Sequence, residues 1–267
     1  MQDADNTGPR TLNEVEKTDN ELVLSFLAVR RAVGSLGLLL PVMLLVLATT
    51  AVVPFEPSIS EFYFTPVREV MVATIGAIAV FLYSYSGFSP DPARIQVRPI
   101  EKYLTDRNVS FVAATGALGV ALFPTSCVDC LVEPQPYTWL ILGEDTAATL
   151  HAISALTFFL ALAAMCLENF TRIKLGVEPD AKKAAEIRIY RLCGQIIFSC
   201  AIALIVLIKG GQMVPWLNQL STCLKLVFWV ETLGLAAFAL SWFIKGETLA
   251  PVVAAVQKLT KSGQAAK

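Results

Sequence analysis

The stretch SISEFYFTPVREVMVATIGAIAVFLYSY, residues 58–85, joins two very different kinds of sequence. From Val70 onward it is almost wholly apolar, whereas the part before it is polar and aromatic and ends in the adjacent charges Arg68 and Glu69. A helix that crosses a lipid bilayer needs about 20 mainly apolar residues. The stretch therefore predicts a membrane helix with a polar, aromatic segment at its entrance.

The composition of the whole chain also favours a membrane protein. Of 267 residues, 55% are hydrophobic and only 16% are charged, whereas soluble domains have about 25% charged residues. The formal net charge of −1 excludes the strongly basic balance of a nucleic-acid-binding protein. The chain contains one histidine, which excludes a multi-histidine zinc site. We therefore expect no metal, no other cofactor and no nucleic-acid partner.

Six apolar segments have the length and composition of membrane spans. They comprise residues 32–53, 67–87, 109–125, 147–167, 192–208 and 224–244. The polar or mixed residues before the first segment are too many for a cleaved signal peptide, which begins with a short basic region. We predict an all-α integral membrane bundle of six transmembrane helices. The expected parts are an N-terminal segment (1–31), a transmembrane domain (32–245) and a C-terminal tail (246–267).

The positions of the lysines and arginines predict the orientation of these spans. Eighteen of the 21 cationic residues fall in the two terminal segments and in the second and fourth connections. The other side would carry only Arg68, Lys209 and Lys225. Cytoplasmic loops carry the excess of positive charge. Both termini are therefore expected in the cytoplasm, with the chain in the inner (cytoplasmic) membrane of a bacterium.

Two charged segments next to the spans are also expected to be helical. NELVLSFLAVRR, residues 20–31, fits either an amphipathic helix on the membrane surface or an early extension of the first span. EPDAKKAAEIRIYR, residues 178–191, alternates positive and negative charges and predicts a solvated cytoplasmic helix.

Two ionisable residues, His151 and Glu231, lie a helical turn or more inside the predicted spans. Glu231 lies in the sixth span, about 9 Å beyond Lys225 at 1.5 Å per residue. His151 lies about one helical turn inside the fourth span. An ionisable group in a membrane is costly unless it faces the bundle interior and pairs, so function is the default hypothesis. The structural alternatives are a buried pair for Glu231 and a hydrogen bond to a neighbouring helix for His151.

Arg68 and Glu69 fall at a similar outer depth, in the first turn of the second span. Arg68 has two interpretations, an interfacial arginine that reaches lipid headgroups or an arginine held for an anionic partner. Arg68, Glu69, His151 and Glu231 would all lie at a similar depth in the outer half of the bilayer, and this coincidence suggests a shared site. We predict an outward-facing polar pocket whose ligand-binding residues are Arg68, Glu69, His151, Glu231, Ser60 and Tyr63.

The cysteines fall into two groups. Cys127 and Cys130, in the sequence CVDC, would lie in the outer third connection, where an oxidising environment permits a disulfide between them. Free thiols and a redox role remain alternatives, although the βαβ context of a thioredoxin-like site is absent. The other four lie in or beside spans and are expected to pack as small apolar residues: Cys166, Cys193, Cys200 and Cys223.

Four segments carry a resemblance to known proteins: ISEFYFTPVREVMVATIGAIAVFLYSY, NVSFVAATGALGVALFPT, LHAISALTFFLALAAMCL and FWVETLGLAAFALSWFIKGE. In this order they resemble an uncharacterised family of bacterial six-span membrane proteins. More distantly, the plan is similar to the DRAM family, which has a serine in the first outer loop, a histidine in the fourth span and a glutamate in the sixth. The resemblance implies a six-helix bundle and a lipid-related role. By position it points to Ser60, His151 and Glu231.

Three functions are compatible with this pattern. The preferred one is a non-enzymatic protein that binds a membrane lipid or another amphiphile, with Arg68 holding an anionic group. The second is an intramembrane lipid-modifying hydrolase or transferase with His151 as general base, oriented by Glu231 or Glu69, and Ser60 as nucleophile. The third is a small proton-coupled transporter, against which the inner halves of the spans offer few ionisable groups. A homo-oligomer is compatible with each of them.

Overall fold

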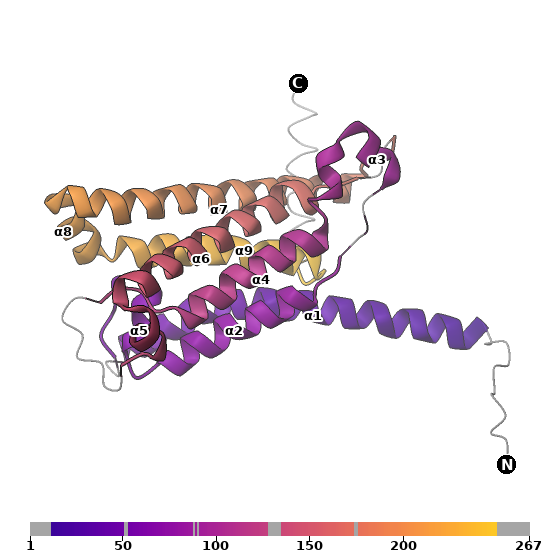
Figure 1. Ribbon diagram of the computed structural model, residues 1–267. Helices are drawn as coiled ribbons and strands as arrows, with labels where there is room; N and C mark the ends of the chain where they lie inside the picture. Colours follow the sequence, from indigo (N-terminus) through magenta and orange to yellow (C-terminus); the bar gives the residue numbers. More distant parts are fainter. Residues whose placement is uncertain are drawn as a thin grey trace, which may run out of the picture.

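The structure, a computed structural model, describes residues 12–50, 53–87, 89, 91–127, 135–173 and 176–249, with side chains from Leu27 onward. Every regular element in these residues is a helix. Six long helices lie alongside one another and run back and forth along the bundle (Figure 1). They are α1 (Leu12–Thr49), α2 (Arg68–Ser84), α4 (Asp106–Leu122), α6 (Glu144–Ala164), α7 (Ala181–Met213) and α9 (Leu226–Lys245).

Short helices mark the two ends of the bundle. At one end, called here the α3 end, lie α3 (Pro92–Val97) and the 3₁₀ turn η2 (Pro99–Lys102). At the opposite end, the α5 end, lie α5 (Tyr137–Leu142) and α8 (Pro215–Leu224). The α5 end also holds the 3₁₀ turn η1 (Ser60–Phe64), and a π-helical turn η3 (Met165–Asn169) continues α6. Apart from the first residues of η3, which fall in the predicted span 147–167, none of these short elements was predicted, because they lack the long apolar run that identifies a span.

Four of the described helices are long and apolar enough to cross a membrane. They are Leu27–Thr49, Glu144–Asn169, Ala181–Met213 and Leu226–Lys245. The two other long helices, α2 and α4, have 17 residues each, so each is about 26 Å long at 1.5 Å per residue. Their length is therefore at the lower limit for a 30 Å hydrocarbon layer.

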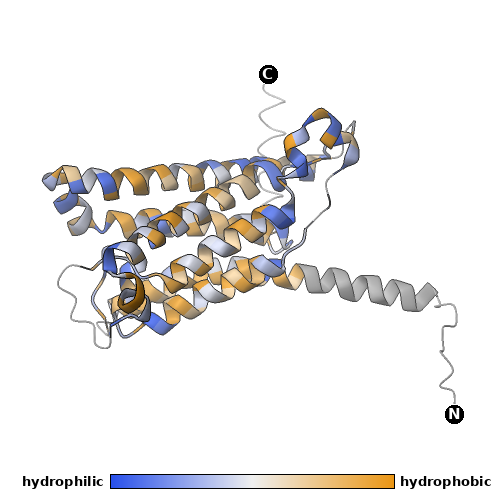
Figure 2. Cartoon of the chain, viewed as in Figure 1, coloured by the Kyte–Doolittle hydropathy of each residue, from blue (hydrophilic) through white to orange (hydrophobic). Residues whose placement is uncertain are grey.

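The outer surface of the bundle is apolar between its two ends. In the most hydrophobic 18-residue stretch of α7, only 28% is buried inside the structure. The corresponding share for Leu27–Thr49 is 33%. Figure 2 shows hydrophobic residues along the middle of the bundle and hydrophilic residues gathered towards the ends. A helix that is apolar on its outward face as well as its inward face suits a lipid environment rather than water.

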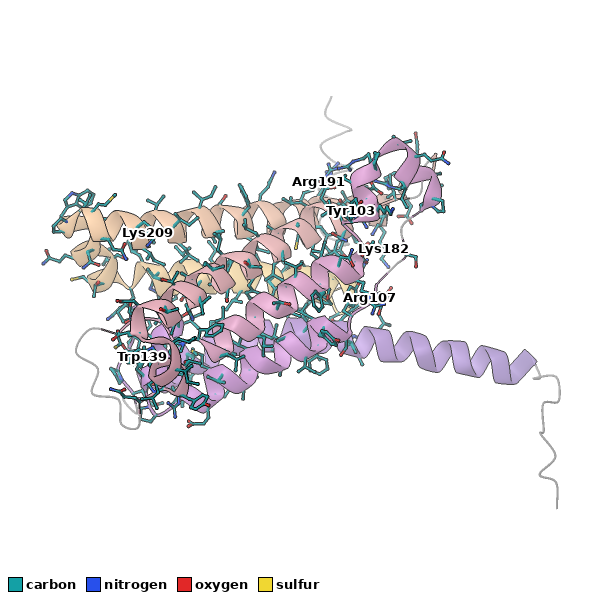
Figure 3. All side chains as sticks on the ribbon, in the orientation of Figure 1. Tyr103, Arg107, Trp139, Lys182, Arg191 and Lys209 are labelled. Atoms are coloured by element: carbon teal, nitrogen blue, oxygen red, sulfur yellow. The ribbon has the colours of Figure 1, made fainter. Side chains whose placement is uncertain are left out.

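Cationic side chains gather at the α3 end. Figure 3 shows Arg107, Lys182 and Arg191 there, whereas Lys209 lies towards the opposite end. This separation agrees with the uneven distribution of lysine and arginine along the chain.

A partly buried ion pair between Arg94 and Glu101 lies at the α3 end. Arg94 donates two hydrogen bonds to the carboxylate of Glu101, at 2.9 and 2.7 Å, and a third to the carbonyl oxygen of Ile173 at 2.7 Å. Glu101 is almost fully buried. These hydrogen bonds from Arg94 lower the pKa of Glu101 below its ordinary value. The pair thus attaches the connection between α2 and α4 to the segment that follows η3.

Two helices are longer than the spans predicted for them. The segment 20–31 is part of α1, so the extension of the first span, rather than a separate surface helix, is observed. The charged segment 178–191 is not a separate helix, because its residues from Ala181 onward form the first part of α7. The Asp180 side chain caps this helix by accepting a hydrogen bond from Lys183 N. Because no proline or glycine interrupts the sequence up to Gly194, the helix continues directly into its apolar part.

Close packing of α4 against α6 positions the site described below. A Cβ atom on Gly116 would lie 2.7 Å from Phe158 N and 2.9 Å from Ser154 O. Glycine therefore permits an approach that any larger residue would prevent. As a result, Phe123, at the C-terminus of α4, lies next to His151 on α6.

Candidate functional site

The segment between α1 and α2 folds into the α5 end of the bundle. We call residues 53–67 the lid segment. Its Phe62 is fully buried, and its Pro57 accepts a hydrogen bond of 2.8 Å from the backbone N–H of Phe228 on α9. The ring of Phe64 lies 5.3 Å from that of Trp139, so the lid segment contacts α5. The lid segment is thus an inserted part of the core rather than a loop above it.

A serine of the lid segment is hydrogen-bonded to the histidine of α6. Ser60, the first residue of η1, has its Oγ 2.9 Å from Nε2 of His151. Both side chains are less than a tenth exposed. The two residues are 91 positions apart in the sequence, so their contact depends on insertion of the lid segment.

The other ring nitrogen of His151 fixes the tautomer. Nδ1 lies 2.7 Å from the backbone carbonyl oxygen of Phe123. A carbonyl oxygen can only accept a hydrogen bond, so Nδ1 carries the proton. In the neutral ring Nε2 then has a free lone pair and accepts a hydrogen bond from the Ser60 hydroxyl. This is the arrangement that a nucleophilic serine and its general base require.

Glu231 joins this pair from α9. Its Oε2 accepts a hydrogen bond of 2.6 Å from the backbone N–H of Ile59, the residue before Ser60. Glu231 therefore holds the backbone next to Ser60.

A small cavity lies beside these residues. It has a volume of about 40 Å³ and is lined by Ser60 and Glu231 together with apolar side chains from α1, α2, α4, α6 and α9. Ser60 and Glu231 therefore border an apolar space inside the bundle.

Arg68, Glu69 and Tyr63 do not line this cavity, contrary to the predicted shared pocket. The Arg68 guanidinium lies 5.4 Å from the centre of the Tyr63 ring, as in a cation–π contact, and Glu69 is exposed. The reason is the helical period, because Val67 and Met71 are buried and take the inward face of the first turn. The structure thus brings together Ser60, His151 and Glu231 and leaves the Arg68–Glu69 pair outside.

Two groups near the site were not predicted from the sequence. The carbonyl of Phe123 is a backbone group, so no residue type signals it. Glu61 is anchored by Ser58, whose Oγ donates to Glu61 Oε1 at 3.2 Å and accepts from Glu61 N at 3.1 Å. Burial raises the pKa of Glu61 above its ordinary value. The sequence Ser-x-x-Glu at the start of a helical turn was the available signal for this contact.

The described cysteines fall into two states. Cys127 is disulfide-bonded, and Cys130 lies outside the described residues, so the Cys127–Cys130 pairing stays a prediction. Cys166, Cys193 and Cys200 are free and buried, whereas Cys223 is free and exposed. Among the described residues, no group of three or more His, Cys, Asp or Glu side chains is arranged to hold a metal ion.

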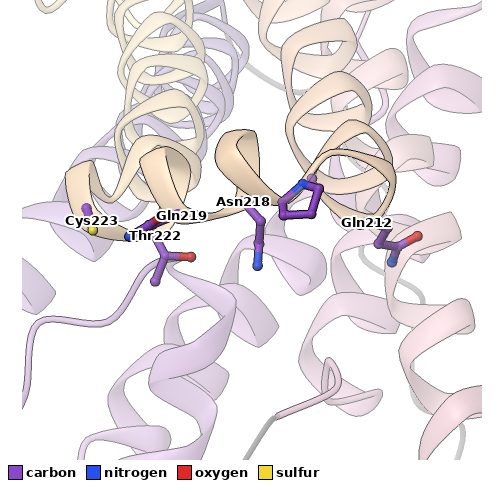
Figure 4. A pocket seen from close by; sticks show the side chains of 7 residues that line it. Gln212, Asn218, Gln219, Thr222 and Cys223 are labelled. Carbon is purple, nitrogen blue, oxygen red and sulfur yellow. The ribbon is translucent and has the colours of Figure 1, made fainter.

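A wider groove lies at the turn between α7 and α8 (Figure 4). Its volume is about 580 Å³, and the amide and hydroxyl side chains of Gln212, Asn218, Gln219 and Thr222 are among its lining. Cys223 also borders it, but the lining includes no histidine, carboxylate or amine that would act as a base for this thiol. The Ser60–His151 pair, unlike this groove, combines a nucleophilic group with a base.

Comparison of the chain with protein-family models, with curated proteins and with solved structures found no match. The function of the protein is therefore inferred from the geometry of the site.

Exchange of Glu231 tests its attachment to the lid segment. Glu231→Ala leaves the buried N–H of Ile59 without an acceptor, which costs about 1–3 kcal/mol of unfolding free energy. Glu231→Gln keeps an acceptor oxygen. We therefore expect the alanine variant to unfold at a lower temperature in detergent, and to be cleaved faster by protease within residues 53–67, than the glutamine variant. Glu69→Ala, on an exposed side chain, is the control, and equal behaviour of all three variants would contradict this role.

Proposed function

We propose that this protein is an intramembrane serine-dependent acyl hydrolase or acyl transferase that acts on an ester of an amphiphile. The observation that carries the proposal is the position of His151 between Phe123 and Ser60. Its Nδ1 is anchored on a carbonyl oxygen at 2.7 Å, and its Nε2 is 2.9 Å from the Ser60 hydroxyl. A nucleophile and a base within hydrogen-bond reach, with the base oriented by a third group, are characteristic of covalent catalysis.

The proposed reaction has two steps. First, Ser60 Oγ attacks the carbonyl carbon of the ester while its proton passes to His151 Nε2. The bond to the alcohol then breaks, the alcohol leaves with that proton, and the acyl group remains as an ester of Ser60. In the second step, water or an acceptor alcohol attacks this ester and gives a proton to Nε2, which returns it to Ser60. The products are the carboxylic acid, or a new ester, and the free serine.

Glu231 has a positioning role in this mechanism. By accepting from Ile59 N it fixes the backbone that carries the nucleophile. Ser60 is the first residue of η1, and the first N–H groups of a helix have no acceptor within the helix. We propose that the Ser60 N–H stabilises the oxyanion that develops when the ester carbonyl is attacked.

The non-enzymatic binding role preferred from the sequence has less support. It required Arg68 to hold an anionic headgroup in the same pocket as His151 and Glu231. Because Arg68 packs over Tyr63 and does not line the cavity, the cavity lacks the cation on which that role depended. The serine–histidine geometry favours catalysis instead.

The proposal includes the arrangement in the membrane. The six long helices would each cross the bilayer, with the α3 end in the cytoplasm of a bacterial cell and the α5 end outside. Two observations support this orientation. Cations gather at the α3 end (Figure 3), and the N-terminal part of α1 and the C-terminal end of α9 lie on that side (Figure 1). The Ser60–His151 pair would then lie at the depth of the outer leaflet, where it could meet a lipid-like ester.

A fluorophosphonate probe tests Ser60 as nucleophile, because such probes form a covalent ester with activated serines. We expect the purified protein to be labelled at Ser60, as mapped by peptide mass spectrometry. Ser60→Ala should abolish the labelling. His151→Gln keeps hydrogen-bonding atoms but not the base, so it should slow labelling by about 10²-fold or more.

Ser58→Ala is the matched control, because Ser58 is a buried hydroxyl of the same lid segment that bonds to Glu61 rather than to His151. This variant should still be labelled. Equal labelling of Ser60→Ala and the natural protein, or labelling that does not respond to His151→Gln, would reject the proposal.

Reporter fusions test the arrangement in the membrane. Fusions after residues 100, 135, 180 and 215 should report cytoplasm, outside, cytoplasm and outside in turn. This order follows from six crossings with the cations retained in the cytoplasm. A fusion after residue 135 that is active only as a cytoplasmic reporter would contradict the topology and, with it, the outer position of the site.

A further inference from the structure

The cavity beside Ser60 limits the size of the group that can bind there. Its volume of about 40 Å³ corresponds to roughly three water molecules, since one needs about 10–15 Å³. This is space for three or four non-hydrogen atoms. A long hydrocarbon chain would not enter without displacing side chains of the core.

The lining of the cavity indicates which part of an ester it would receive. Ser60 and Glu231 form its polar border, and the remaining lining is apolar, including Ile78 of α2, Phe159 of α6 and Leu235 of α9. An apolar group attached to a carbonyl on Ser60 would find its hydrocarbon part among these side chains. The cavity therefore fits the acyl side of the ester.

We infer that the acyl group transferred to Ser60 is short, with two to four carbon atoms. This inference rests on the proposed function and adds the substrate class to it, namely an amphiphile that carries a short-chain acyl ester. The long chains of such an amphiphile belong to the alcohol part, which leaves in the first step. Inserting a long acyl chain would instead overpack the core, which destabilises a folded protein.

A series of p-nitrophenyl esters tests the acyl length. The acetate, butyrate and octanoate are each mixed with the purified protein, and nitrophenolate release and the mass of the acylated protein are followed. Rates are taken relative to Ser60→Ala to remove hydrolysis elsewhere. We expect acetate and butyrate to acylate Ser60 at least about tenfold faster than octanoate, since a pocket discriminates by roughly 10-fold or more per misfitting methylene. Acylation of Ser60 by octanoate at an equal or higher rate would overturn the inference.

Enlarging the cavity gives a second test. Leu235→Ala removes a lining side chain and should raise the octanoate rate relative to acetate by about tenfold. Leu233→Ala, on a side chain that is 52% exposed, is the control and should leave the ratio unchanged. An unchanged ratio in folded Leu235→Ala would also contradict the short-chain cavity. If that variant does not fold, the series with the natural protein decides.

The outcomes distinguish failure of the proposed acyl-transfer function from failure of the chain-length inference. If neither the esters nor the fluorophosphonate modify Ser60, the acyl-transfer function fails together with the chain-length inference. If the fluorophosphonate labels Ser60 but octanoate is the preferred ester, only the short-chain inference fails.

Discussion

The imidazole of His151, held between a backbone carbonyl and a serine hydroxyl, is the interaction on which the site depends. The carbonyl of Phe123 reaches Nδ1 only because α4 and α6 are in close contact at Gly116. The hydroxyl of Ser60 reaches Nε2 only because the lid segment is inserted into the bundle. Packing between helices and insertion of the lid segment therefore act together to set one tautomer of one ring.

The surroundings of this ring increase the importance of its hydrogen bonds. Polar groups away from water interact more strongly, and an unpaired one is costly. The polar groups of the site are paired, since both ring nitrogens of His151 are hydrogen-bonded and Glu231 accepts a hydrogen bond from Ile59 N. The lid segment, with Phe62 fully buried and Phe64 packed on Trp139, also limits the access of water from the α5 end. Such an environment favours transfer of a proton between Ser60 and His151 over its loss to solvent.

Much of the helical fold could be predicted from the sequence, because long apolar runs identify helices directly. Helix ends were predicted less well, and α7 begins at Ala181 rather than near residue 192 because charged residues continue a helix as readily as apolar ones. For the site, the depth of His151 and Glu231 in their predicted spans and the position of Ser60 before the second span pointed to the three residues that the structure brings together. Arg68 was misleading because depth alone does not give the helix face. The Phe123 carbonyl could not be predicted, since every residue carries one.

The tautomer of His151 can be measured directly, because His151 is the only histidine of the chain. Protein grown with ¹⁵N-labelled histidine gives one pair of ring-nitrogen signals in an NMR spectrum. We predict a protonated Nδ1 and an unprotonated Nε2 at neutral pH, with the Nε2 signal shifting in Ser60→Ala because its hydrogen-bond donor is removed. A protonated Nε2 with an unprotonated Nδ1, or an Nε2 signal that is the same in Ser60→Ala, would contradict the assignment of His151 as the base for Ser60.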